Sequence, residues 1–263
     1  MKKIIGKIYR KVHSYIKPQK ICLVLCVYNE EKNLPKYLEY IEPHVDFIVA
    51  LDDGSTDKTK KILKASSKLK YLIERPKKKN IGDWNEVANR EELLNKAKEL
   101  GADWVIALDP DERFEKEFLK NLRSIVESSD QNTVFGLRFR ELWDKYDQYR
   151  TDGIWGEKVR YCLFPLNREI IYKQGRQKLH FRWYPDSLLG HEFLLDYDMY
   201  HLKMILPKER KKRAKLYNSL DPKKKYQAMG YDYLIDEKGL TIAKIPKEHA
   251  YDYRSVNEEL LKH

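Results

Sequence analysis

Three short segments rich in oxygen-bearing side chains each follow a run of apolar residues. They are residues 28–31 (YNEE), 52–57 (DDGSTD) and 109–112 (DPDE). Any one of them is explained by a helix cap or a turn, because Asp, Asn, Ser and Gly suit both structures. Together they offer the carboxylate oxygens that a hard divalent cation prefers. The chemistry to consider first is therefore the binding of Mg²⁺ or Mn²⁺.

The segment Asp109-Pro110-Asp111 is the most informative of the three. Proline disfavours the helical conformation for the residue before it, so Asp109 is expected to be extended. In an extended chain, residues two apart point to the same side, and the carboxylates of Asp109 and Asp111 then converge on one point. The alternative is that Asp111 only caps a helix that starts near Glu112.

Alternating strands and helices are expected to position these segments. Apolar runs predict strands at 21–27, 47–51, 71–73 and 104–108, and helical spacing predicts helices at 31–41, 56–69 and 87–100, the last ending at Gly101. This alternation predicts an α/β fold with right-handed βαβ units and a mostly parallel central sheet. Ligands of such sheets bind beyond the carboxyl ends of the strands, where all three polar segments fall.

Composition sets the outer bounds. The chain has 263 residues, a net charge of +11 and 42 % hydrophobic residues, which fits one large globular domain and excludes whole-chain disorder. No apolar run approaches the length of a membrane span, and no signal peptide is expected. Three cysteines without paired spacing indicate a reducing compartment. The positive charge fits nucleic acid, an anionic membrane surface or an anionic substrate.

The rest of the chain divides into less regular parts. Residues 1–20 predict a basic amphipathic helix, which either lies on a membrane surface or packs on the domain. Residues 21–130 form the first half of the domain. Residues 131–263 form the second half and a helical C-terminal region, with strands expected at 134–140, 159–164 and 178–182 and a helix at 208–220.

The three polar segments, read with their flanks, resemble the successive motifs of family-2 glycosyltransferases with the Rossmann-like GT-A fold. The matching stretches, within residues 21–126, are CVYNEEKNLPKYL, VALDDGSTDKTKKIL and DWVIALDPDERF. The resemblance implies a transferase of the hexosyl type that is inverting, with a nucleotide-sugar donor, usually a UDP-sugar, and a DxD motif that uses Mn²⁺ or Mg²⁺. Within the family, the chain resembles bacterial transferases of the lipopolysaccharide core and surface glycans.

The resemblance also implies roles for individual residues. The base and ribose pocket is lined by Val27, Tyr28 and Glu30. Asp53 is expected to hydrogen-bond the base with Asp52 beside it, and Arg90 to lie near the nucleotide unless it is an ordinary surface arginine. Asp109 faces the sugar or ribose and the metal, and Asp111 is the direct metal ligand. A further ligand is expected from a histidine of the second half, with His201 favoured over His180 and His191.

An inverting transferase needs a carboxylate that accepts the proton of the acceptor hydroxyl. Glu192 is favoured, because relatives resembling lipopolysaccharide-core enzymes carry a His-Glu pair at a similar place, and Asp198 is the second choice. Asp186 and Asp196 are further candidates, and any of the four can instead be a surface acid. The aromatic residues of this half either stack on acceptor sugars or form core, and core is expected for most of them, with Trp155 and Trp183 as the likelier loop positions. They are Trp143, Tyr146, Trp155, Trp183 and Tyr184.

The partners expected are a UDP-sugar and a glycan or glycolipid acceptor of polysaccharide biosynthesis. Basic residues at 2–20 and 208–215 would hold a cytoplasmic protein against the inner face of a membrane. One alternative is a sugar nucleotidylyltransferase, but residues 28–31 lack the Gly-rich, Arg-containing loop expected there. The other is a non-enzymatic nucleic-acid-binding protein, but Asp-rich strand ends repel phosphates. No nucleic acid is expected as a partner.

Overall fold

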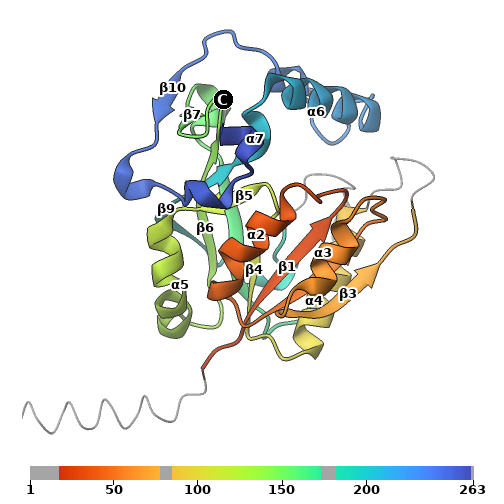
Figure 1. Cartoon of the computed structure of the whole chain (residues 1–263). Helices are drawn as coiled ribbons and strands as arrows, with labels where there is room; N and C mark the ends of the chain where they lie inside the picture. The colour runs from red at the N-terminus through yellow and green to blue at the C-terminus, as the bar shows by residue number, and fades with distance from the viewer. Residues whose placement is uncertain (1–17, 78–84, 173–181, 262–263) are drawn as a thin grey trace, which may run out of the picture.

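The computed structural model describes residues 18–77, 85–172 and 182–261. Its main feature is an eight-stranded sheet in the order β3-β2-β1-β4-β8-β6-β9-β5 (Figure 1). The strands are β1 (Ile21–Val27), β2 (Phe47–Asp52), β3 (Leu69–Glu74), β4 (Trp104–Ala107), β5 (Glu112–Phe114), β6 (Val134–Glu141), β8 (Val159–Pro165) and β9 (Glu192–His201). A two-stranded antiparallel sheet joins β7 (Gln148–Arg150) to β10 (Ile242–Lys244).

The first four strands form the parallel part of the sheet, with β1 between β2 and β4. Every second residue of β1, such as Leu23, enters one core, and the alternate residues, such as Val24, enter another. The first core is covered by α2 (Leu34–Ile41), α3 (Thr59–Ala65) and α5 (Lys116–Ser128), and the second by α4 (Glu86–Glu99). Burial on both faces explains why β1 is a continuous apolar run.

The predicted α/β fold with a mostly parallel central sheet is confirmed, and so is most of its alternation. The strand expected at 21–27 has those bounds, and Gly101 ends α4 with φ +81°. The helix predicted for 56–69 is wrong at both ends, because α3 covers only Thr59–Ala65 and Ser66 is extended. A helix starting near Glu112 is also wrong, because residues 112–114 pair with β9 as strand β5.

The second half contributes strands to the same sheet. β6 and β8 match the strands expected at 134–140 and 159–164, whereas β9 was not predicted. β9 lies parallel to β6 and antiparallel to β5, and it thereby links the two halves. The strand expected at 178–182 lies mostly outside the described residues, as do residues 1–17 of the predicted N-terminal helix.

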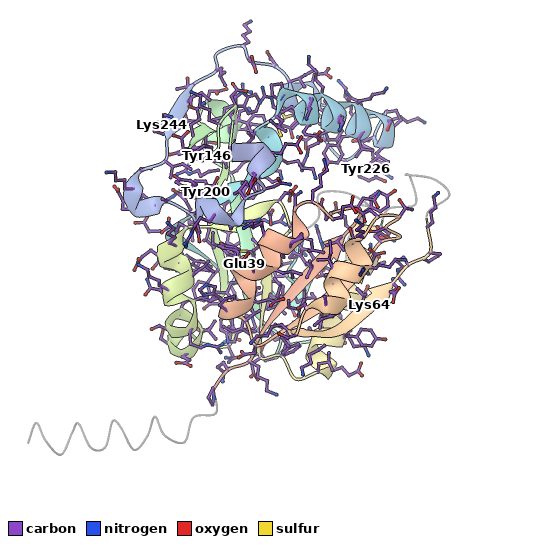
Figure 2. The ribbon with its side chains drawn as sticks, viewed as in Figure 1. Glu39, Lys64, Tyr146, Tyr200, Tyr226 and Lys244 are labelled. Atoms are coloured by element: carbon purple, nitrogen blue, oxygen red, sulfur yellow. The ribbon has the colours of Figure 1, made fainter. Side chains whose placement is uncertain are left out.

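The C-terminal region begins with α6 (Pro207–Leu220), which matches the helix predicted there. It continues as short 3₁₀ turns and strand β10, and its last described element is α7 (Glu258–Leu261). Tyr200 of β9 packs against Tyr251 of this region, with 5.1 Å between ring centroids. Figure 2 shows Tyr146 and Tyr200, whose rings contact Tyr253 and Tyr251 of the C-terminal region. Within the described ranges, the structure contains no helix with the length and apolarity to cross a membrane.

Trp143 anchors this region and is fully buried. The guanidinium groups of Arg210 and Arg150 lie 4.0 and 4.6 Å from its ring centroid, and Trp155 packs edge-on at 5.4 Å. Tyr184 is also buried, which confirms the core assignment for Trp143 and Tyr184. Trp155 and Trp183, expected at loop positions, are buried as well and belong to the core.

Candidate active site

The site lies at the carboxyl edge of the sheet, beyond the ends of β1, β2 and β4. The pairing of β5 with β9 brings the far end of β9 to this edge, because Glu112 is the partner of His201. The parallel pairing of β6 with β9 places Glu141 opposite His201 as well. Helix α6 lies on the side of the molecule toward which β1 points (Figure 1). Residues from both halves therefore converge here.

Asp111, His201 and Glu141 form the centre of the site. The Nε2 atom of His201 is 3.3 Å from Oδ2 of Asp111, and its Nδ1 atom is 2.5 Å from Oε2 of Glu141. All three side chains are at least 86 % buried. A carboxylate on one ring nitrogen fixes the orientation of the ring and leaves the other nitrogen to face Asp111.

The charges in this group strongly shift its titration. Burial alone would lower the pKa of His201, but the carboxylates of Glu141 and Asp111 outweigh it and raise that pKa to about 9. Burial alone would raise the pKa of Asp111, but Lys203 and His201 hold it well below its usual range. The ammonium group of Lys203 is 3.5 Å from Asp111 Oδ2 and 3.4 Å from Glu30 Oε1. Asp111 is therefore an ionised carboxylate amid cations.

Asp109 lies beside this centre and is paired with an arginine. Its carboxylate accepts a hydrogen bond from Nη2 of Arg160 (3.1 Å), and its backbone N–H donates to Oε2 of Glu112 (2.8 Å). Burial, opposed by Arg160 and reinforced by the charge of Asp111, raises the pKa of Asp109. The same causes raise the pKa of Glu112 to about 7. Arg160 thus compensates two closely spaced carboxylates.

The loops after β1 and β2 are joined by hydrogen bonds. The N–H of Asn29 donates to the hydroxyl of Ser55 (2.9 Å), and the N–H of Thr56 donates to Oδ1 of Asn29 (2.8 Å). Oδ1 of Asp52 accepts from the N–H groups of Gly54 (3.2 Å) and Ser55 (2.9 Å). The other oxygen of Asp52, Oδ2, is buried and has no hydrogen-bond partner among the described residues.

The other residues expected to bind the nucleotide-sugar donor are at or just after the ends of β1 and β2 and in α4. Val27 is buried at the end of β1, Tyr28 is exposed, and Asp53 is buried, with its N–H bonded to the carbonyl of Val27. Arg90 of α4 pairs with Glu86 at 3.0 Å, and its guanidinium lies 4.6 Å from the ring centroid of Trp183. Arg90 is buried, which argues against an ordinary surface arginine.

The central group fits a divalent cation. Two neighbouring ligands that each lie close to Mg²⁺ or Mn²⁺ are about 3 Å apart. Asp111 Oδ2 and His201 Nε2 are 3.3 Å apart without any rearrangement. Glu141 supplies the carboxylate that commonly orients a metal-bound histidine. Asp111 and His201 would therefore hold the ion, with Asp109 beside them.

A second acidic group in the described part of the chain consists of Glu115, Asp198 and His249. It fits a cation less well, because two arginines and a backbone N–H already engage its carboxylate oxygens. Oε2 of Glu115 accepts from Asp198 N–H and His249 Nδ1, and Oδ1 of Asp198 is bonded by Arg138 (2.6 Å) and Arg140 (3.0 Å).

The acids expected to act as the base are not brought to the centre. Glu192 begins β9 and His201 ends it, so nine residues, or about 30 Å of strand, separate them. Glu192 instead accepts a hydrogen bond from the hydroxyl of Tyr184 (2.6 Å). Asp198 is buried on the face of β9 opposite His201 and pairs with two arginines. Asp196 and Asp186 pair with Arg138 and Arg182.

Four residues of the site were missed in the sequence: Glu141, Arg160, Lys203 and Arg213. Glu141 had a usable signal, since it directly follows a predicted strand, as Asp52 and Asp109 do. Lys203 lies two residues after the favoured histidine and had no signal of its own. Arg213 sits in a lysine-rich helix, where only the fold singles it out. Its Nη1 lies 3.3 Å from His201 Nε2.

Comparison with known proteins gives one curated relative and several solved structures. The relative is an uncharacterized glycosyltransferase, the MG060 homolog of Mycoplasma pneumoniae, which is 29 % identical over 99 residues. These residues are 37 % of this chain and 31 % of the relative, so the match spans less than a third of the relative's length.

Two of the solved structures to which the chain is similar show the extent of the similarity. One is glucosyl-3-phosphoglycerate synthase from Mycobacterium tuberculosis, in complex with Mn²⁺, UDP-glucose and phosphoglyceric acid. It is 22 % identical, with coverage of 46 % of this chain and 44 % of that chain and a TM-score of 0.33. The other is 4-diphosphocytidyl-2C-methyl-D-erythritol synthase, 15 % identical, with coverage of 57 % and 75 % and a TM-score of 0.37.

The family assignment rests on a longer match. The family described as "Glycosyl transferase family 2" matches residues 22–197, which is more than half of the chain. That span contains both loops at the strand ends, Asp109, Asp111 and Glu141. The chain therefore belongs to glycosyl transferase family 2.

Proposed function

We propose that this protein transfers a sugar from a nucleotide-sugar donor to an acceptor hydroxyl, with inversion and with the help of Mn²⁺ or Mg²⁺. The observation that carries the proposal is the buried Asp111–His201–Glu141 group at the carboxyl edge of the sheet, in a chain of glycosyl transferase family 2. An ionised Asp111 and an oriented histidine suit the metal that a nucleoside diphosphate requires.

The donor proposed is a UDP-sugar. The loops after β1 and β2 would hold its base and ribose, with Val27, Tyr28 and Asp53 around the base. The buried Oδ2 of Asp52 lacks a partner among the described residues and would suit an N–H of the base. Binding of UDP-glucose and Mn²⁺ by glucosyl-3-phosphoglycerate synthase agrees with this choice. Arg90 is proposed to assist near the nucleotide.

The reaction proposed is one displacement at the anomeric carbon. The acceptor oxygen forms the new bond as the bond to the β-phosphate oxygen breaks, and UDP departs with the electron pair. The acceptor proton passes to a base. Asp111 and His201 would hold a divalent ion, which would supply positive charge for the diphosphate as it departs. Glu141 would orient His201, and Asp109 would lie toward the sugar.

The acceptor proposed is a glycan or glycolipid held near an anionic membrane. The first half of the domain, residues 21–130, would bind the donor, and residues 131–263 the acceptor. The outer face of α6 carries four exposed lysines, and exposed Leu216 lies beside them. They are Lys208, Lys211, Lys212 and Lys215. A basic face with an apolar residue suits an anionic lipid surface.

The transfer proposal is tested by mass spectrometry of donor turnover. The full chain is incubated with single UDP-, GDP- and CDP-sugars and Mn²⁺, with water as the acceptor that takes the sugar and released nucleoside diphosphate as the readout. We expect Mn²⁺-dependent release of UDP from one UDP-sugar by the wild type and not by Asp111→Asn. Asp252→Asn, on a residue remote in sequence from the site and paired with Arg254, is the control and should match the wild type. Release of no nucleotide from any donor would contradict the proposal.

The proposed binding of α6 to an anionic membrane is tested in a separate experiment. Co-sedimentation compares vesicles of phosphatidylcholine with vesicles containing phosphatidylglycerol, using the wild type and a triple variant with Lys211, Lys212 and Lys215 replaced by Glu. We expect binding only to the anionic vesicles and a loss of binding in the variant. Equal binding of both proteins would exclude this face of α6 as the contact surface.

A further inference from the structure

Lys203 occupies an unusual place for a cation in this site. It lies in the 3₁₀ turn Leu202–Met204 directly after β9, and the N–H of Leu202 holds this turn to the carbonyl of Asp111 (2.8 Å). The Lys203 ammonium is 3.5 Å from Oδ2 of Asp111 and 3.4 Å from Oε1 of Glu30. Its side chain is 35 % exposed, whereas both carboxylates are 14 % exposed. Lys203 therefore bridges the loop after β1 and the aspartate expected to bind metal.

The oxygen that Lys203 contacts is the oxygen expected to bind metal. Oδ2 of Asp111 also faces His201 Nε2 at 3.3 Å, so one atom serves the lysine and the proposed metal position. A divalent ion on that oxygen would place two like charges next to each other, which disfavours the lysine contact. The ammonium group of Lys203 can move away from Asp111, because it is carried on a flexible four-carbon side chain.

A second cation stands at the same edge. Nη1 of Arg213, from α6, lies 3.3 Å from His201 Nε2, and its guanidinium is 5.4 Å from the ring centroid of Tyr217. Arg213 thus approaches the metal position from α6, while Lys203 approaches it from the turn after β9. Once a divalent ion is bound at the proposed metal position, the two cations Lys203 and Arg213 supply more positive charge than is required to neutralise Asp111 and Glu30. They match a ligand with several negative charges, such as a diphosphate.

We propose that Lys203 is an exchanging cation of the active site. Without ligands, the Lys203 ammonium neutralises Asp111 and Glu30 and supplies the positive charge that the metal ion would otherwise provide. When the divalent ion binds Asp111, the Lys203 ammonium moves to the diphosphate of the donor, where Arg213 joins it. This inference rests on the proposed function. It assigns Lys203 two successive partners, and it makes the binding of metal and of donor mutually favourable.

The exchange predicts opposite effects of one substitution on two affinities. In Lys203→Met, Mn²⁺ alone should bind about tenfold more tightly, because the competing ammonium is gone. UDP at saturating Mn²⁺ should bind about tenfold more weakly, because a cation of the diphosphate site is gone. Free Mn²⁺ is counted by electron paramagnetic resonance, and UDP binding is measured by calorimetry. Lys208→Met is the matched control and should leave both affinities within about twofold of the wild type.

Lys208 is suited to this control because it lies five residues away and pairs on the surface with Glu259 at 3.5 Å. A second variant, Lys203→Arg, keeps the charge and should restore UDP binding while still hindering Mn²⁺. If Lys203→Met fails to fold, as its melting transition would show, the comparison is made with Lys203→Arg and Lys203→Gln. Gln should then behave as predicted for Met.

Mn²⁺ affinity that is unchanged or weakened in the uncharged variant would overturn the exchange. So would UDP affinity that is unchanged at saturating Mn²⁺. A failure of the proposed function is a separate result, because wild-type protein would then bind no nucleoside diphosphate in the presence of Mn²⁺. In that case the Mn²⁺ measurement alone still decides whether Lys203 competes with the ion.

Discussion

Glu141 and His201 are register partners on β6 and β9, and the carboxylate of Glu141 lies 2.5 Å from Nδ1 of His201. This pairing turns Nε2 of His201 toward Asp111, although the two residues are 90 positions apart in the sequence. The proposed metal position therefore depends on the pairing of three strands, β5, β6 and β9, rather than on one motif.

Replacing Asp111 by Asn should abolish high-affinity Mn²⁺ binding without unfolding the protein. The amide is neutral and offers one oxygen, so the ion loses its main anionic ligand. Electron paramagnetic resonance of Mn²⁺ measures the loss, and the melting temperature shows whether the fold is intact. A variant that binds Mn²⁺ as tightly as the wild type would remove Asp111 from the metal site.

Glu141→Gln should weaken Mn²⁺ binding about 10- to 100-fold, as is typical for loss of a carboxylate that orients a metal-bound histidine. Glu141 is a positioning residue, so its effect should appear in metal affinity and in the pH dependence of that affinity. Glu248→Gln, an exposed acid in the C-terminal region, is the control and should bind Mn²⁺ normally. An unchanged affinity in Glu141→Gln would contradict the role.

The pH dependence of Mn²⁺ affinity should carry the signature of His201. Its pKa in the metal-free protein is raised from 6.5 to about 9, so the ion must displace a proton throughout the neutral range. Affinity should rise by about tenfold per pH unit up to about pH 9 and then level off. In Glu141→Gln the plateau should begin at lower pH. A wild-type plateau that starts near pH 7 would indicate that His201 is not the ligand.

The turn after β2 should tolerate no side chain at Gly54. Its φ is +89°, and an added Cβ would lie 2.5 Å from the carbonyl oxygen of Pro76. Gly54→Ala should therefore reduce UDP affinity and cost about 1 kcal/mol or more of unfolding free energy. Gly239→Ala separates the two causes, because Gly239 has φ +73° and open space around it. Equal stability losses in both variants would show that the close contact with Pro76 is unimportant.

Trp143→Ala should destabilise the protein by about 3–5 kcal/mol, because a fully buried ring flanked by Arg150 and Arg210 is removed. Urea unfolding measures the change. Tyr226→Phe, on a partly exposed ring of the same region, should cost little. A loss below about 1 kcal/mol in Trp143→Ala would contradict the anchoring role.

The sequence predicted the parallel half of the fold because its signals are local. Residues 21–27 are apolar on both faces, and each polar turn directly follows a strand. β9 was missed because its outer part is partly exposed and its first residues carry no alternating pattern. β5 was missed because a three-residue strand exists only through its pairing with β9. Local pattern cannot supply either signal.

The same distinction between local sequence signals and long-range contacts explains which residues of the candidate site could be proposed from the sequence. Asp109, Asp111 and His201 could be proposed from the sequence because a short motif and a family resemblance point to them, and the structure brings Asp111 and His201 together. Glu192 was favoured as the base by its neighbour His191, yet the length of β9 carries it to the other end of the strand. Lys203 and Arg213 belong to the site only because the turn after β9 and α6 fold over the sheet edge. Their contacts are long-range, and no spacing in the sequence encodes them.

An anomalous difference map from crystals grown with UDP and Mn²⁺ would locate the ion itself. We expect a strong peak within coordination distance of Asp111 Oδ2 and His201 Nε2, with the diphosphate beside it. A peak between Glu115, Asp198 and His249, or no ordered Mn²⁺ next to bound UDP, would contradict it.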